Sequence, residues 1–488
     1  MEKFQLYING QFEPGVRQFE SINPANEKPW AQVAEAGRDE TERAVESAYE
    51  AFHSPIWKAY TASQRGKLLL RLADLIEQHA AELARLETQD TGKIIRETQA
   101  QISYVAEYYR YYAGLADKME GAYLSIDKPD METWIRREPI GVVAAIIPWN
   151  SQLFLSAVKI GPAIAAGCTL VIKASEYAPT PLLALASLIH QAGFPAGVCN
   201  IITGFSSECG EILTQHPKVN HIAFTGGVET AKYIVRNSAE NLASQSLELG
   251  GKSPFIVFDD ADLESAANAQ VAAIFAASGQ SCVAGSRLLV SQSIKDEFLN
   301  KLKEKAQAIV IGDPKQHSTQ FGPLCTLKQI EKIKQVVDNS IKQGAALITG
   351  HYDVTEKGYY YPPTILDCTK VPKADCVKLE LFGPVLSVQS FDSEAEALAL
   401  ANDSDYGLAA GIFTKNLTRA HRLTKQLRTG IVWLNTYRAV SPLAPFGGYK
   451  LSGHGREGGL DAAMQYTTTK TVWLRTSDEA IDDPFIMR

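Results

Sequence analysis

The chain has 488 residues, of which 45% are hydrophobic, enough for two or more domains with large cores. It carries 48 Lys and Arg against 55 Asp and Glu, a net charge of −7. This acidic balance gives no attraction to phosphate backbones or anionic lipid headgroups, so neither nucleic acid nor a membrane is expected as a partner. The expected partners are a small molecule and further copies of the chain.

Seven cysteines are scattered along the chain without a CxxC pair or a metal-ligand spacing with the nine histidines, so no metal site is predicted. Their odd number and low density favour free thiols in a reducing compartment. The N-terminal segment carries charges, and the apolar stretch at 142–147 is too short to span a bilayer. We therefore predict a cytoplasmic protein.

The first part of the chain is predicted to be helical. Ser63 is a candidate N-cap for one long helix, whose apolar positions from Leu69 to Leu86 are three and four residues apart. A second helical stretch, rich in aromatic residues, covers 103–118.

After residue 140 the pattern changes to alternating strands and helices. Short β-branched runs stand at 141–147, 168–174, 198–204 and 220–226, and helix-like segments at 155–166, 180–192, 207–215 and 228–240. This alternation is typical of βαβ units on a parallel sheet, which bind ligands at the carboxyl ends of their strands. A second α/β block begins with the strand-like segment 253–258.

Two strand-like segments, 134–140 and 469–475, fall outside both blocks. Because an open strand edge seldom stays unpaired, we expect these segments to form an arm that contacts a neighbouring subunit.

Two residues occupy sequence contexts that favour a catalytic role. Cys282 follows a glycine-containing turn in FAASGQSCVAGSR, and Glu248 precedes two glycines in LELGGK. A thiol commonly works with histidine, but His454, within SGHGREGG, is the one histidine in a motif-like context, so a thiol–histidine pair is disfavoured. Alone, each residue is also compatible with ordinary packing or a surface charge.

Seven motifs in order make the chain resemble the NAD(P)-dependent aldehyde dehydrogenase superfamily, in its non-acylating type. They are PWN at 148–150, KASE at 173–176, FTGG at 224–227, LELGGK at 247–252, GQSC at 279–282, ELFGPV at 380–385 and PFGGYKLSGHGREGG at 445–459. The resemblance implies an α/β fold with three parts. These are a Rossmann-like NAD-binding domain (1–117 and 140–251), an α/β catalytic domain (252–451) and a small β oligomerisation arm (118–139 and 467–488) of a homodimer or homotetramer.

The resemblance implies oxidation of an aldehyde to a carboxylic acid. Cys282 would attack the aldehyde to give a thiohemiacetal and then a thioester, with the Asn150 amide and the Cys282 backbone N–H stabilising the oxyanion. Glu248 would activate the water that hydrolyses the thioester. Lys159 and Glu457 match a family pair that is either a proton relay or a structural ion pair.

The same resemblance implies NAD as the cofactor. A carboxylate at Glu176 repels a 2′-phosphate, so NADP is expected to bind more weakly. Gly227 stands where the family usually has serine, which removes one hydroxyl donor. The residues implied in cofactor binding are Ile146, Pro148, Trp149, Lys173, Glu176, Gly204, Thr225, Gly226, Gly227, Leu249, Glu380 and Phe382.

The implied substrate tunnel is lined by Tyr104, Tyr108, Ser151, Phe154, Arg438 and Phe446. Ser151 replaces an aromatic residue found in many relatives, which favours a wider, more polar mouth for a polar, cyclic or semialdehyde substrate. Arg438 either pairs with a substrate carboxylate or is a solvated surface residue. Three alternatives remain: a CoA-acylating semialdehyde dehydrogenase, a catalytically silent structural relative, and a thiol hydrolase without nicotinamide.

Overall fold

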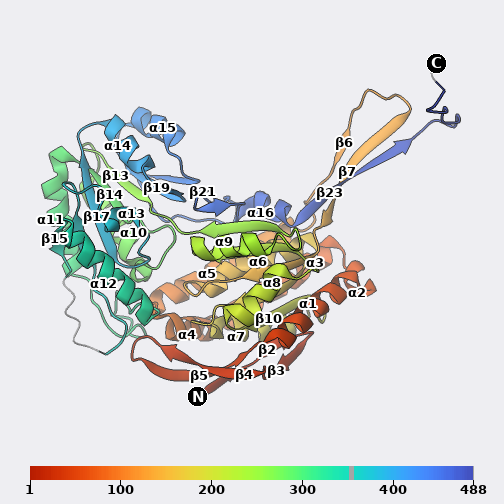
Figure 1. The fold of residues 1–488 in the computed structure, drawn as a ribbon, viewed down its shortest axis with the longest axis horizontal. Coiled ribbons are helices and arrows are strands. Elements are labelled where there is room, and N and C mark those ends of the chain that lie inside the picture. Colours follow the sequence, from red (N-terminus) through yellow and green to blue (C-terminus); the bar gives the residue numbers. More distant parts are fainter. Residues whose placement is uncertain (351–356, 487–488) are drawn as a thin grey trace.

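The computed structural model describes residues 1–350 and 357–486, which form two α/β bodies and a projecting arm (Figure 1). Each body is built on a mostly parallel sheet covered by helices, which confirms the predicted α/β class. Within the described part of the chain, no helix is both long and apolar enough to cross a membrane.

The first sheet has eight strands in the order β22-β12-β11-β8-β9-β10-β2-β3. Its five central strands are parallel: β8 (Val142–Ile146), β9 (Thr169–Ala174), β10 (Cys199–Thr203), β11 (Val219–Gly226) and β12 (Ser244–Leu249). The chain runs from β8 outward to β10 and then returns to the other side of β8 with β11. These neighbours, β8 and β11, therefore mark the topological switch point where open sheets bind ligands.

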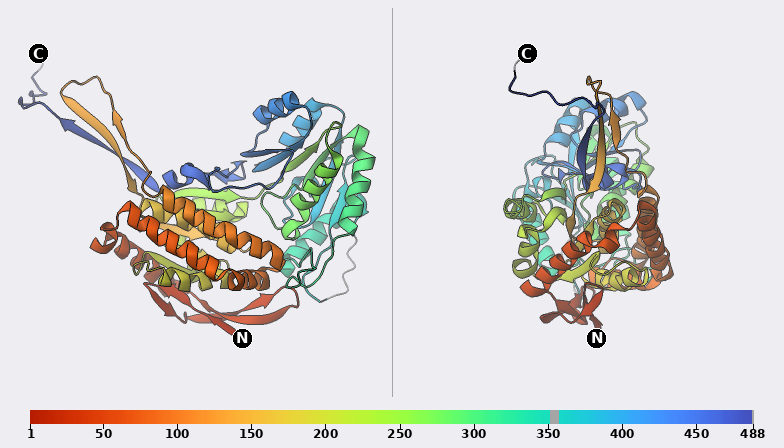
Figure 2. Two further views of the ribbon diagram at one scale, coloured as in Figure 1. Left: turned by 180° about the vertical axis from the view of Figure 1, so that it is seen from behind. Right: turned by 90° about the vertical axis from the view of Figure 1, so that its right-hand side faces the viewer.

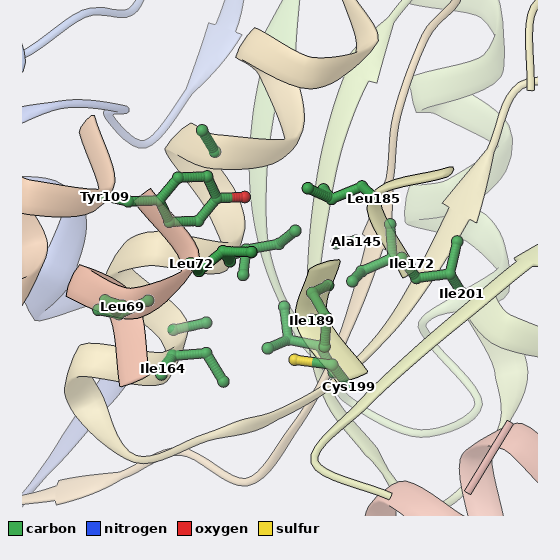
Figure 3. Packing of buried hydrophobic residues seen from close by; sticks show 14 of the residues in the cluster. Leu69, Leu72, Tyr109, Ala145, Ile164, Ile172, Leu185, Ile189, Cys199 and Ile201 are labelled. Atoms are coloured by element: carbon green, nitrogen blue, oxygen red, sulfur yellow. The ribbon is translucent and has the colours of Figure 1, made fainter. Parts of the chain in front are cut away.

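Helices cover both faces of this sheet, which explains why its central strands β8 and β9 are nearly continuous apolar runs. Along β8, Val143 and Ala145 belong to one core and Val142 and Ala144 to the other. The first core packs against α3 (Ala62–Gln78), α4 (Ala80–Thr91), α5 (Ile95–Leu115), α6 (Gln152–Ala166) and α7 (Thr180–Gln191). The second packs against α1 (Arg38–His53), α8 (Glu211–Gln215) and α9 (Val228–Asn237). Figure 3 shows part of the first core, which includes Leu72 and Tyr109 from the helices and Ile172 from β9.

The predicted long helix after Ser63 is two helices, and the prediction of Ser63 as its N-cap was wrong. The hydroxyl of Thr61 accepts a hydrogen bond from Gln64 N at 3.3 Å, and Gln64 Oε1 accepts one from Thr61 N at 2.8 Å. This reciprocal capping box starts α3 before Ser63. The helix ends at Gln78, and α4 begins after His79.

The N-terminal strands had no counterpart in the sequence prediction. β2 (Leu6–Ile8) and β3 (Gln11–Glu13) extend one edge of the eight-stranded sheet. β1 (Glu2–Phe4), β4 (Arg17–Asn23) and β5 (Lys28–Glu35) form a separate three-stranded sheet. The strands β1 to β3 have only three residues each, too few to show a period of two in the sequence.

The second sheet has seven strands in the order β15-β16-β17-β14-β13-β19-β20. These are β13 (Pro254–Val257), β14 (Arg287–Ser291), β15 (Ala346–Thr349), β16 (Thr364–Asp367), β17 (Val385–Phe391), β19 (Ala409–Phe413) and β20 (Ile431–Leu434), and only β15 is antiparallel to its neighbour. Its surrounding helices are α10 (Leu263–Phe275), α11 (Lys295–Gln307), α12 (Leu327–Lys342), α13 (Asp375–Lys378), α14 (Glu394–Asn402) and α15 (Leu417–Gln426).

The last part of the chain returns to the first body. β22 (Gly453–His454) pairs antiparallel with β12, so that Gly453 lies opposite Glu248. The short helix α16 (Gly459–Gln465) then contacts α6. This return brings the 445–459 motif to the end of β12.

The arm consists of β6 (Ala122–Leu124), β7 (Met131–Pro139) and β23 (Thr467–Arg475). β7 and β23 pair over nine residues each, from Met131↔Arg475 to Pro139↔Thr467. The arm projects away from both bodies (Figure 2). The last two residues of the predicted arm, 487–488, lie outside the described residues.

Candidate active site

A cavity of about 440 Å³ lies where the carboxyl end of the first sheet meets the second body. It brings together the three predicted catalytic residues, Asn150, Glu248 and Cys282. All six predicted tunnel residues also line it: Tyr104, Tyr108, Ser151, Phe154, Arg438 and Phe446. The sequence separation of these residues shows that the cavity is assembled by tertiary folding.

Cys282 lies in a constrained loop after α10. The preceding Ala277 and Ser278 both have positive φ, of 51° and 54°, which is an uncommon conformation for residues with a side chain. The backbone N–H of Ala277 is held by Glu97 Oε1 at 3.0 Å. All seven cysteines are free and lie in the described residues; six are buried, whereas Cys282 is partly exposed to the cavity.

The Cys282 thiol is in an environment that disfavours its negative charge. Desolvation raises the pKa of Cys282 to about 12, and the carboxylates of Glu380 and Glu248 contribute to the rise. The charge of Arg438 opposes it. The thiol is therefore protonated at neutral pH and needs a base to become a nucleophile.

Glu248, at the end of β12, is a buried carboxyl without a hydrogen-bond partner among the described residues. The residue is 3% exposed. Desolvation raises its pKa well above the usual range, and the negative charge of Glu457 raises it further. A Cβ atom at Gly447 would lie 2.6 Å from Glu248 Oε1, so the glycine of the PFGG motif leaves room for this carboxyl.

Asn150 follows β8 at the switch point and is fixed by the loop of the cysteine. Its Nδ2 donates to the backbone oxygen of Gln280 at 3.0 Å. The amide has two N–H protons, so the second remains available to an acceptor in the cavity.

Lys159 and Glu457 form a buried ion pair in the wall beside Glu248. Lys159 is fully buried, and its Nζ also donates to Thr225 Oγ1 at 2.6 Å. Glu457 is held by two backbone hydrogen bonds to Phe446. Thr225 and Leu249, which the motifs assigned to cofactor binding, line the same cavity.

The other predicted cofactor residues follow the same sheet edge. Lys173, at the end of β9, contacts Glu176 with 3.3 Å between Nζ and Oε2. Ile146 pairs with Lys173 across β8 and β9. Gly204 approaches the N-terminal segment so closely that a Cβ there would lie 2.6 Å from Ala36 O.

The start of α9 is open enough to accept a ligand. Gly227 is the N-cap of this ten-residue helix, and a Cβ placed on it would meet no atom within 4 Å. Gly226 ends β11 immediately before it. The N–H groups at a helix start favour a phosphate anion.

Glu380 and Phe382 face this edge from the second body. The Glu380 carboxyl accepts a hydrogen bond from Gly251 N at 2.9 Å, and burial raises its pKa to about 7. The rings of Phe382 and Trp149 meet edge to face at 5.4 Å, beside Pro148.

Sequence reasoning missed a group of polar residues in the cavity wall. Lys93 Nζ donates to Ser151 Oγ at 2.6 Å, to Gln101 Oε1 at 2.9 Å and to Glu87 Oε1 at 3.1 Å. Lys93, Gln101 and Glu97 line the cavity. No local pattern marks these residues, because their shared position arises from the packing of α4, α5 and the start of α6.

A family model described as the aldehyde dehydrogenase family matches residues 12–472. The chain is 69% identical, over all of both chains, to (Z)-2-((N-methylformamido)methylene)-5-hydroxybutyrolactone dehydrogenase of Acinetobacter baylyi. It is 41% identical to betaine aldehyde dehydrogenase of Bacillus subtilis, over 98% of each chain. An NAD⁺ complex of a Bacillus cereus aldehyde dehydrogenase has a TM-score of 0.96 and 42% identity, covering 98% of this chain and 97% of that one.

The chain therefore belongs to the aldehyde dehydrogenase family. This confirms the recognition made from the motifs and, with it, an enzyme of NAD-dependent aldehyde oxidation.

Proposed function

We propose that the enzyme oxidises a polar aldehyde to its carboxylic acid through a thioester on Cys282. The observation that carries this proposal is the convergence in one cavity of a thiol, an amide with a free proton and an unpartnered buried carboxyl. Formation and hydrolysis of a thioester need these three groups: a nucleophile, an oxyanion donor and a base.

The residues at the sheet edge fit NAD. Glu176 and Lys173 would hold the adenosine ribose, and the start of α9 at Gly227 would receive the pyrophosphate. Glu380 and Phe382 would position the nicotinamide ribose and ring. When bound, NAD supplies the acceptor for the hydride that leaves the substrate carbon.

In the first half of the reaction the Cys282 thiol gives up its proton and the sulfur attacks the aldehyde carbon. A C–S bond forms while the electron pair of the carbonyl double bond moves to the oxygen, which becomes an oxyanion. When hydride then leaves the same carbon, the C=O bond re-forms and the thioester remains on Cys282. The free Nδ2 proton of Asn150 and the Cys282 backbone N–H stabilise this charge. Glu248 is the base in the same cavity that accepts the thiol proton.

In the second half water attacks the thioester carbon, and Glu248 takes the proton of that water. The C–S bond breaks, the carboxylic acid leaves, and the sulfur is free for the next cycle. The raised pKa of Glu248 makes it a stronger base than an exposed carboxylate. Glu457 and Lys159, buried beside it, form the relay that passes the proton onward.

For the substrate we propose a polar, cyclic hydroxylactone or the open aldehyde in equilibrium with it. A 5-hydroxybutyrolactone is the ring form of an aldehyde acid, so opening of the ring exposes the carbon that a thiolate attacks. The Acinetobacter baylyi relative is named for such a compound. The cavity volume of about 440 Å³ and its polar wall at Lys93, Gln101 and Ser151 support a substrate larger and more polar than a short alkanal.

The exposed arm supports the proposal of a homodimer or homotetramer. Tyr123 and Trp473 are 65% and 55% exposed on it, as expected for a surface completed by a second subunit. For the location of the enzyme we propose the cytoplasm. The seven free cysteines agree with a reducing compartment.

The test is to incubate the purified enzyme with NAD and a panel of aldehydes and hydroxylactones, and to record NADH absorbance. We expect NADH with the hydroxylactone, independent of added CoA, and an equimolar amount of carboxylic acid. Formation of an acyl-CoA, or no NADH with any compound, would contradict the proposal.

A further inference from the structure

Ser151 stands at the start of α6 but does not cap it. Its hydroxyl makes no hydrogen bond to the first turn of the helix. Serine is a preferred N-cap residue because its oxygen usually accepts such a bond from a backbone N–H. The side chain instead turns to Lys93 and Gln101, which donate to its oxygen at 2.6 Å and 3.3 Å. The Ser151 side chain therefore binds Lys93 and Gln101 rather than capping the helix.

These two bonds determine the role of the hydroxyl. A serine oxygen has two lone pairs, and Lys93 and Gln101 occupy both. The hydroxyl proton is then directed away from these two residues, and the structure gives it no acceptor among the described residues. Since Ser151 lines the cavity, its O–H is a donor available to a bound molecule.

The supporting residues are themselves fixed. Lys93 is 6% exposed, and its three N–H donors are all used, by Glu87, Gln101 and Ser151. Glu87 is fully buried, so its charge balances that of Lys93 at short range. The network therefore presents an oriented donor without presenting a free positive charge.

The remaining charges of the cavity favour a neutral acceptor. Two cationic side chains and three carboxyl side chains line it, namely Lys93, Arg438, Glu97, Glu248 and Glu457. Arg438 Nη1 is engaged by the carbonyl oxygens of Ala272 and Ala276, at 3.2 and 3.4 Å. This occupies one end of the guanidinium fork that grips a carboxylate. The carboxyl side chains of the cavity would repel an anionic group of the substrate when they are ionised, whereas an uncharged carbonyl oxygen meets no such repulsion.

We propose that the Ser151 hydroxyl donates a hydrogen bond to a second, uncharged carbonyl oxygen of the substrate, such as that of an ester or amide. Lys93 and Gln101 are positioning residues that hold the hydroxyl in this direction. The inference rests on the proposed oxidation of an aldehyde and names the substrate class that this cavity selects.

The test compares two aldehydes with the same number of non-hydrogen atoms, methyl 4-oxobutanoate and heptanal. For the parent enzyme and for Ser151→Ala, the ratio of kcat/KM for the ester over heptanal is measured at saturating NAD. We expect the ratio to fall roughly tenfold in Ser151→Ala, the effect of losing one well-placed hydrogen bond. Ser151→Thr, which keeps the hydroxyl, should stay within about twofold of the parent ratio.

Gln101→Leu tests the positioning role, because it frees one lone pair of Ser151 and relaxes the direction of the proton. We expect the ratio to fall by about threefold, with the loss in KM for the ester rather than in kcat. A melting temperature equal to that of the parent separates this effect from a loss of folding.

Three results would overturn the proposal. One is an unchanged ratio in Ser151→Ala, and another is a ratio in Ser151→Thr as low as that in Ser151→Ala. Turnover of heptanal by the parent shows that aldehyde oxidation itself is intact, so either result then counts against Ser151 alone. Absence of NADH from every aldehyde would overturn the proposed function and this inference together.

Discussion

The carboxylate of Glu457 raises the pKa of Glu248 although the two residues are 209 positions apart in the chain. Lys159, paired with Glu457, acts on Glu248 in the opposite direction. Burial is the largest cause of the raised pKa of Glu248, and the ion pair adds two opposing charge effects that can be removed separately.

This relationship predicts opposite shifts in the pH profile of steady-state turnover. A base works in its deprotonated form, so a raised pKa places the rising limb of kcat at a pH above that of an ordinary carboxyl. Glu457→Gln removes the charge that raises the pKa and should move the limb to lower pH. Lys159→Met removes the charge that lowers it and should move the limb to higher pH. Shifts in the same direction would show that the pair does not act on Glu248 by charge.

Replacing Glu248 with glutamine keeps its shape and removes the base. We expect a burst of NADH from the first turnover, followed by a steady state reduced by about 10²-fold or more, because thioester hydrolysis loses its base. Stopped-flow absorbance separates the two phases. If both phases equal those of the parent, Glu248 is not the base.

Cys282→Ala should abolish NADH formation, because no covalent intermediate can form. Calorimetric titration with NAD should give a Kd within about threefold of the parent value, since no predicted cofactor contact involves this side chain. Hydrolysis of 4-nitrophenyl acetate should disappear as well, because the same sulfur would be acylated. Cys325→Ala, at a buried cysteine outside the cavity lining, is the matched control. Measurable turnover by Cys282→Ala would rule out this nucleophile.

Glu176→Gln should narrow the preference for NAD over NADP. The carboxylate repels a 2′-phosphate, and Lys173, 3.3 Å away, is left to attract it when the carboxylate is neutralised. We expect the ratio of kcat/KM values for NAD and NADP to fall by about tenfold, or about 1.4 kcal/mol. An unchanged ratio would place Glu176 away from the ribose.

Association through the arm predicts a change of assembly when its surface becomes charged. Trp473 and Leu474 are neighbours on β23 and are 55% and 47% exposed, so both faces of the arm sheet present apolar groups. Trp473→Glu together with Leu474→Lys should give smaller species in multi-angle light scattering. Circular dichroism checks that the fold is kept. A monomeric, well-folded parent protein would contradict the prediction.

The sequence alone determined the α/β class and the first strands of the parallel sheet, because β8 and β9 are nearly continuous apolar runs followed by proline or a polar residue. β9 and β11 end as the pattern predicted, at Ala174 and Gly226. The order of the motifs also identified Asn150, Glu248 and Cys282, since Glu248 and Cys282 stand in short glycine-containing motifs and Asn150 ends the PWN motif.

Only the tertiary structure decided the strand pairing, the hydrogen-bond partners and the pKa values of particular residues. The three-residue strands β1 and β2 depend on pairing with the later strands β5 and β10, and they show no pattern of their own. The donor role of Ser151 depends on Lys93 and Gln101, which reach it from residues 50 or more positions away. The pKa of Glu248 likewise depends on burial and on the carboxylate of Glu457, 209 positions later in the chain. Hydrogen-bond direction and charge–charge interaction depend on distance in space, so a local pattern names the residue while the packing sets its chemistry.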